Sequence, residues 1–275
     1  MTVVRLPDTD RLRSEVDAMV AAVVEALLDR FGPGILGLWF KGSAQKPWDS
    51  SIDYVPELSD VDIHFRADEV TLAQFCDLDT ALGLHADIGA RFAAVCPAPL
   101  HVPRPQLVSA AEMERFLPAP IGTVQTLHGP VPAGPTDLDQ EATRRADAAS
   151  VLASADPQVL GRAIADLLER PGHHLFALVR SLSWRVAPLG PRILSVLGVD
   201  YDVAWSGNRT SVVRRLCDLG QDGLAGHVVT FYEAAWDAYV SGWADGEAGR
   251  TAFASAVRAL RLGATVAGAA ADQAR

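Results

Sequence analysis

The sequence predicts an α+β protein in two parts, a mixed α/β domain over residues 1–135 and an all-helical bundle domain over residues 136–275. Short apolar runs with period-two alternation, typical of β-strands, lie in the first part. In the second part apolar residues follow helical spacing throughout. Between the two lies Gly129–Pro135, a stretch rich in proline and glycine that is typical of a domain boundary.

The elements of the first domain follow from local patterns. The first helix ends at Gly32 and Pro33, because glycine and proline stop helices. In the second helix, over 70–95, we expect the apolar residues Leu72, Phe75, Leu82, Phe92 and Val95 to face inward. In order, we predict a helix over 8–30, strands over 35–40 and 60–65, a helix over 70–95, and strands around 100–108 and 123–128 with a short helix over 110–116 between them.

The second domain shows only helical patterns, separated by glycine, proline and asparagine. Its predicted helices cover 137–155, 157–170, 173–187, 191–198, 208–220, 222–241 and 247–270. Residues 208–210 match the glycosylation triplet, which has no meaning in the cytoplasm.

Composition excludes several classes of protein. Apolar residues make up 49% of the 275, enough for a large core, and the net charge of −10 disfavours nucleic-acid binding. The three cysteines are widely spaced and form no zinc motif. No apolar run approaches the length of a membrane span, and the N-terminus does not resemble a signal peptide. We therefore expect a soluble cytoplasmic protein without a membrane partner.

Chemistry-bearing residues cluster around the two predicted strands. Asp60 and Asp62 are two apart on one strand, so their side chains point to the same face, where a cation such as Mg²⁺ can offset their repulsion. Gly42 and Ser43 follow the preceding strand and offer open backbone and a hydroxyl to a phosphate. The only two lysines of the chain, Lys41 and Lys46, flank this segment, and we expect them to bind the nucleotide, with one of them offsetting the charge that develops on its phosphates.

These residues carry a resemblance. Residues 35–66 resemble the signature of the DNA polymerase beta-like nucleotidyltransferase superfamily, an apolar residue, Gly and Gly/Ser followed by two acidic residues that alternate with apolar ones. Within it the chain is most similar to bacterial antibiotic (aminoglycoside) nucleotidyltransferases, which also place a helical bundle after the catalytic domain. The resemblance implies that Gly42 and Ser43 contact the triphosphate and that Asp60 and Asp62 hold Mg²⁺.

The chain departs from this family at two places. The loop between Ser43 and Asp60 is longer than the family usually has, and its composition indicates a specialised lip of the site rather than a linker. Many members also carry a third carboxylate on the strand after the intervening helix, whereas residues 100–108 contain no Asp or Glu. Two candidates for the catalytic base therefore remain, His101 on one side and the pair Glu233 and Asp237 of the helical domain on the other. We favour the pair.

A row of aromatic side chains accompanies Glu233 and Asp237. The row forms one face of a predicted helix and indicates either core packing or a substrate wall. Its members are Tyr232, Trp236, Tyr239 and Trp243.

The predicted function is nucleotidyl transfer, AMP from ATP with Mg²⁺, onto a hydroxyl of a small molecule such as an aminoglycoside or another natural product. The partners are then a nucleoside triphosphate and a small hydroxylated acceptor, bound by a monomer or homodimer. Two alternatives remain, a catalytically inactive nucleotidyltransferase-fold binding protein and a protein adenylyltransferase of the toxin–antitoxin type.

Overall fold

The computed structural model describes residues 9–109, 123–131 and 139–273. The chain divides into two compact units, one made of residues 1–46 and 59–134 and the other of residues 47–58 and 135–275. The division at 134/135 lies next to the predicted boundary. Residues 47–58, however, which the sequence prediction left in the first domain, belong to the helical unit. The predicted helix over 110–116 lies outside the described residues.

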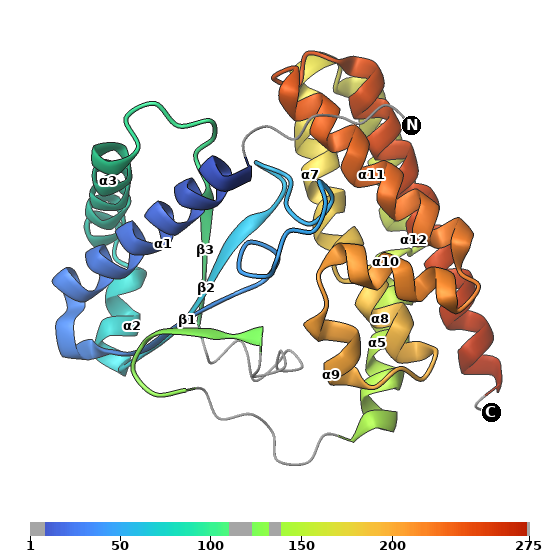
Figure 1. The fold of residues 1–275 in the computed structure, drawn as a ribbon, viewed down its shortest axis with the longest axis horizontal. Helices are drawn as coiled ribbons and strands as arrows, with labels where there is room; N and C mark the ends of the chain where they lie inside the picture. The colour runs from blue at the N-terminus through green and yellow to red at the C-terminus, as the bar shows by residue number, and fades with distance from the viewer. Residues whose placement is uncertain (1–8, 110–122, 132–138, 274–275) are drawn as a thin grey trace. The chain divides into compact units, whose positions relative to one another are not determined.

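The first unit contains a four-stranded mixed sheet (Figure 1). The order across the sheet is β3-β2-β1-β4, with β2 and β3 parallel and the other neighbours antiparallel. The strands are β1 (Ile35–Lys41), β2 (Asp60–Ala67), β3 (Arg104–Ser109) and β4 (Gln125–His128).

Helices cover one face of this sheet. They are α1 (Thr9–Phe31), which ends in a short 3-10 turn (Gly32–Gly34), α2 (Glu69–Phe75) and α3 (Leu78–Val95). Phe65 of β2 stacks on Phe75 of α2, with ring centroids 4.7 Å apart, and Phe75 stacks on Phe31 of α1 at 4.9 Å. Because side chains alternate along a strand, Asp60, Asp62 and His64 lie on the opposite face.

The helix predicted over 70–95 is two helices, α2 and α3, and a capping aspartate precedes each of them. Asp68 accepts a hydrogen bond from the backbone N–H of Thr71 at 2.7 Å, and Asp77 accepts one from Thr80 at 2.9 Å. Each aspartate thereby satisfies a backbone N–H that the first turn of its helix leaves without a partner.

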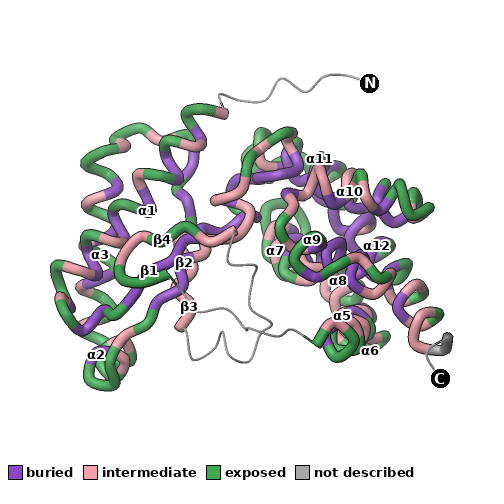
Figure 2. The backbone as a smooth tube through the Cα atoms, turned by 60° about the horizontal axis from the view of Figure 1, so that its bottom comes forward, coloured by how far each residue is buried: buried purple, intermediate pink, exposed green. Residues whose placement is uncertain are grey.

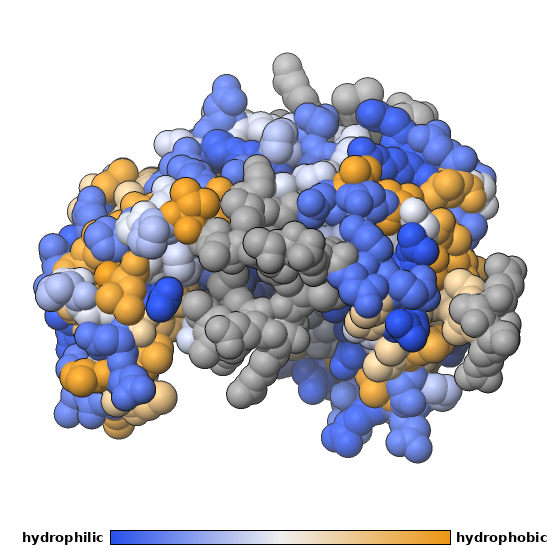
Figure 3. All heavy atoms as spheres, turned by 90° about the horizontal axis from the view of Figure 1, so that it is seen from below, coloured by the Kyte–Doolittle hydropathy of each residue, from blue (hydrophilic) through white to orange (hydrophobic). Residues whose placement is uncertain are grey.

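The inward face of α3 also differs from the prediction. Phe92 is buried as expected, together with Leu84 and Ile88, whereas Leu82 and Val95 are 58% and 71% exposed. The helix packs on one side only, and Figure 2 shows most of its outer surface exposed. On the face drawn in Figure 3, apolar side chains of this unit gather in small groups among polar ones.

The second unit is helical apart from residues 47–58. Two 3-10 turns (Leu167–Glu169 and Gly172–His174) lie between the helices that end at Asp166 and begin at Leu175. No helix in the part of the chain that the structure describes is long and apolar enough to cross a membrane. The helices are α5 (Gln140–Ser154), α6 (Pro157–Asp166), α7 (Leu175–Val186), α8 (Leu189–Val196), α9 (Tyr201–Ser206), which was not predicted, α10 (Arg209–Asp218), α11 (Asp222–Val240) and α12 (Gly246–Gln273).

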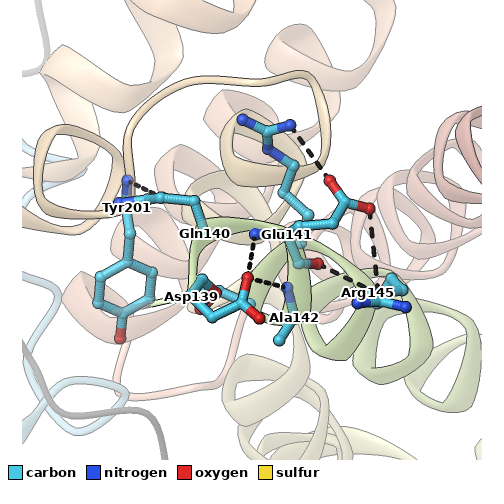
Figure 4. Close-up of polar contacts among 8 residues, drawn as sticks. Asp139, Gln140, Glu141, Ala142, Arg145 and Tyr201 are labelled. Atoms are coloured by element: carbon cyan, nitrogen blue, oxygen red, sulfur yellow. Dashed lines mark hydrogen bonds and ion pairs between the residues drawn. The ribbon is translucent and has the colours of Figure 1, made fainter. Parts of the chain in front are cut away.

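Polar contacts fix the start of α5 beside α9 (Figure 4). Asp139 caps α5 by accepting hydrogen bonds from the backbone N–H groups of Glu141 and Ala142, both at 3.0 Å. The side chain of Gln140 accepts one from the backbone N–H of Tyr201 at 3.3 Å. The beginnings of two helices far apart in the sequence are thereby held together.

Candidate functional site

Asp60 and Asp62 converge on one point of the sheet face opposite α1, α2 and α3. Gln106 of β3 lies opposite Asp62 in the parallel register. With its side-chain amide oriented so that the nitrogen faces the two carboxylates, that nitrogen donates to Asp62 Oδ1 and to Asp60 Oδ2, both at 3.2 Å. The prediction that the two aspartates share a face is therefore confirmed by their common neighbour.

Arg104, at the start of β3, holds Asp60. The two residues are register partners, and the guanidinium makes a two-point contact, Nε to Oδ1 at 2.8 Å and Nη2 to Oδ2 at 2.6 Å. Paired donors of this kind match the geometry of a carboxylate and form strong charge-assisted hydrogen bonds. A cation of the protein thus occupies both oxygens of one of the two predicted metal ligands.

Lys41 lies beside Asp62, its register partner across β1 and β2. Burial lowers the pKa of Lys41, and the charge of Asp62 partly opposes this effect. His64 lies on the same face and is 6% exposed. Its pKa is lowered to about 3 by burial and by the charge of Lys41, so its imidazole is neutral at physiological pH.

The turn after β1 approaches Asp62 closely at Gly42. The backbone of Gly42 has φ +86°, and a Cβ atom there would lie 2.0 Å from Asp62 Oδ2. Hydrogen bonds from the backbone N–H groups of Gln45 and Lys46 to the carbonyl of Gly42, at 3.2 and 3.3 Å, close the turn. Ser43 is half-buried within it. Only glycine fits at position 42, because both the φ angle and the space exclude a side chain.

The side chain of Arg13 in α1 anchors the turn that follows β1. Its guanidinium donates to the carbonyl of Lys46 at 2.8 Å and to the carbonyl of Ala44. Ala44 is fully buried. The turn that carries Gly42, Ser43 and Lys46 is therefore anchored to the first helix.

His101, one of the predicted bases, has a different environment from the one expected. It precedes β3, its side chain is inaccessible to solvent, and its Nδ1 lies 2.9 Å from Glu15 Oε2 of α1. Glu15 also accepts hydrogen bonds from the backbone N–H groups of Leu100, at 2.7 Å, and of His101, at 3.2 Å. The ring lies buried against α1, so we no longer propose it as the base.

Residues 47–58, which we call the strap, pack within the helical unit. Asp53, 1% exposed, accepts hydrogen bonds from the backbone N–H and the hydroxyl of Thr210 at 2.8 and 2.7 Å. Asn208 donates to the carbonyl of Pro47 at 3.0 Å and to Asp49 at 2.8 Å, and Arg209 donates to the carbonyl of Ile52 at 2.9 Å. The residues that match the glycosylation triplet therefore bind the strap.

The aromatic row also contacts the strap, although only Tyr232, Trp236 and Tyr239 lie on α11. Trp243 was predicted on the same helix face but follows the end of α11 at Val240, in a turn with φ +62°. Trp236 donates to the carbonyl of Ser51, and Trp243 donates to Glu57 at 2.6 Å. Tyr232 is 1% exposed, with the guanidinium of Arg209 4.0 Å from its ring centroid. These contacts favour packing of the strap over a substrate wall as the role of this row.

Glu233 and Asp237 lie on the solvent-exposed side of α11, while most of their neighbours on the helix are buried. Their assignment as catalytic base stays a prediction.

Three residues near Asp60 and Asp62 on the same sheet face have no role in the sequence prediction. They are Arg104, Gln106 and His64. Strand alternation places His64 with Asp60 and Asp62, so its position could have been anticipated. The positions of Arg104 and Gln106 could not have been predicted, because they depend on the register of β3 on β2, which no local sequence pattern specifies.

The donor set suits a magnesium ion only in part. Among the described residues no group of three or more His, Cys, Asp or Glu side chains is arranged to hold a metal ion. Mg²⁺ in nucleotide sites, however, is commonly held by one or two carboxylates together with water and phosphate oxygens. Asp60 and Asp62, which lie close together with Asp62 packed against the backbone of Gly42, supply the carboxylates for such a site.

A scan against protein-family models finds no match, and searches of curated proteins and of solved structures also find none. Function is therefore argued from the site.

Proposed function

We propose that the protein is a nucleotidyltransferase that moves AMP from ATP onto a hydroxyl of a small molecule such as an aminoglycoside or another natural product. One observation carries the proposal: Asp60 and Asp62 converge on a single point beside the Gly42 turn. Two neighbouring carboxylates suit a triphosphate that binds with Mg²⁺.

In this reaction the acceptor oxygen forms a bond to the α-phosphorus, and the bond from that phosphorus to its bridging oxygen breaks. Pyrophosphate leaves, and the hydroxyl proton passes to a base. Mg²⁺, when bound, neutralises charge on the phosphate oxygens. Asp60 and Asp62 would hold the ion and thereby orient the phosphates, and Lys46 would add positive charge beside them.

The test is pyrophosphate release from each nucleoside triphosphate with Mg²⁺ across a panel of hydroxylated acceptors. We expect release by the wild type with one class of acceptor and a loss of at least about a hundredfold in Asp60→Asn and Asp62→Asn. Asp218→Asn, an exposed aspartate of α10, is the matched control. Turnover close to that of the wild type in Asp62→Asn contradicts the proposal.

A second candidate function is nucleotide binding without catalysis. The observation that favours it is β3, where Arg104 and Gln106 face Asp60 and Asp62 and no carboxylate does. Binding of ATP by calorimetry, combined with no pyrophosphate release for any acceptor, supports this candidate over the first.

A further inference from the structure

The contact between Arg104 and Asp60 joins a movable group to a fixed one. The side chain of Asp60 is 8% exposed, whereas that of Arg104 is 44% exposed. Arg104 stands at the first residue of β3, and its guanidinium ends a long flexible stem. The guanidinium can therefore leave Asp60 for solvent or for a ligand, while the carboxylate stays within the sheet.

Each of the two carboxylates has a cation as its register partner. Arg104 is opposite Asp60, and Lys41 is opposite Asp62. Lys41 is half-buried at the end of β1. Arg104 is thus the cation that competes with a metal for the oxygens of Asp60, because it occupies both of them.

His64 gives an independent sign that this face receives a polar ligand. Its ring is 6% exposed, and the described residues offer its Nδ1 no hydrogen-bond partner. A buried polar atom without a partner is costly and is typical of functional sites. Alternation along β2 puts this atom on the face that carries Asp60 and Asp62.

We propose that Arg104 is a switching counter-ion, which pairs with Asp60 in the ligand-free protein and moves to the phosphate oxygens of the triphosphate when a divalent cation takes its place. The guanidinium fork suits both partners, since carboxylate and phosphate each accept two parallel hydrogen bonds. The inference rests on the proposed function and adds a phosphate-binding residue to it.

The experiment measures two affinities separately. Calorimetry gives the affinity for Mn²⁺ without nucleotide and the affinity for ATP at saturating Mn²⁺. Without Arg104, no guanidinium competes with the metal for the oxygens of Asp60, but the phosphates lose a cationic partner. We expect Arg104→Ala to bind Mn²⁺ about tenfold more tightly and ATP, in the presence of Mn²⁺, about tenfold more weakly.

Two further variants make the result specific. Arg66→Ala removes the same charge near the far end of β2, about 20 Å along the strand from Asp60, and we expect both affinities to change by less than about twofold. Arg104→Lys keeps the charge without the fork, and we expect both of its affinities between those of the wild type and Arg104→Ala. If Arg104→Ala does not fold, as judged by circular dichroism, Arg104→Lys carries the test.

The outcomes separate the inference from the proposed function. Opposite changes in the two affinities support the switch. Metal affinity that is unchanged or weakened, or ATP affinity that is unchanged, assigns Arg104 to the structure of the sheet and overturns the switch while nucleotide binding stands. A wild-type protein that binds neither Mn²⁺ nor ATP overturns both.

Discussion

Asp53 accepts two hydrogen bonds from Thr210, one from its backbone N–H at 2.8 Å and one from its hydroxyl at 2.7 Å. The backbone N–H groups of Asp49 and Ser50 donate to the same carboxylate at 2.9 and 3.0 Å. The charge also lies at the N-terminus of α10, where the helix dipole favours it. One buried aspartate therefore both shapes the strap and docks it.

Replacing Asp53 by asparagine tests this role. The amide cannot accept all of these hydrogen bonds, so we expect the free energy of unfolding to fall by about 1–3 kcal/mol. Urea denaturation measures the change. Asp218→Asn, at the exposed end of α10, serves as the control and is expected to change stability by less than about 0.5 kcal/mol. Equal stability of the two variants contradicts the role of Asp53.

Gly42→Ala tests the close approach to Asp62. Gly220 has a similar φ of +72°, but a Cβ atom there would meet nothing within 4 Å, so Gly220→Ala isolates the cost of the backbone conformation. We expect that control to lose about 1 kcal/mol of stability. Gly42→Ala should lose more and also lose nucleotide transfer, because its Cβ displaces the carboxylate of Asp62. Similar losses of stability with transfer intact in both variants count against the approach.

The buried pair of Glu15 and His101 predicts a pH dependence of stability. Burial alone raises the pKa of Glu15, but hydrogen bonds from the backbone N–H of Leu100 and from His101 outweigh it and hold this pKa below its ordinary value of 4.5. The stabilisation is therefore fully present above pH 4.5 and is lost as the pH falls through the folded-state pKa.

We expect Glu15→Gln to unfold with a free energy about 1–3 kcal/mol lower than that of the wild type at pH 7. The difference should shrink as the pH is lowered toward about 3. Urea titrations at several pH values measure it. Glu25→Gln, an exposed residue of the same helix, should show less than about 1 kcal/mol at any pH. A difference for Glu15→Gln that does not vary with pH refutes the linkage.

The base remains to be located by kinetics. If Glu233 or Asp237 accepts the hydroxyl proton, its amide variant should lose about a hundredfold in kcat while the affinity for ATP stays unchanged. Glu247→Gln, an exposed acid of α12, is the control. Retention of kcat within about threefold by both Glu233→Gln and Asp237→Asn excludes α11 as the source of the base.

Local pattern was enough to predict most of the helices and strands. Apolar spacing placed α1 within one residue at each end, and alternation placed β2 from its first residue. It missed the division between α2 and α3, because the apolar spacing continues across Asp77, the residue that caps the start of α3. It also missed α9, a helix of only six residues, too short for a periodic signal.

The sequence by itself determined that Asp60 and Asp62 share a face and that glycine follows β1, since strand alternation and backbone freedom are local properties. Only the tertiary structure decided the neighbours of these residues. The pairing of β3 with β2 places Arg104 beside Asp60 and Gln106 beside Asp62. The packing of α1 buries His101 against Glu15. Thr210 at the start of α10 binds Asp53 of the strap. The physical reason is that strand register and helix packing depend on contacts between segments far apart in the chain, which no local pattern specifies.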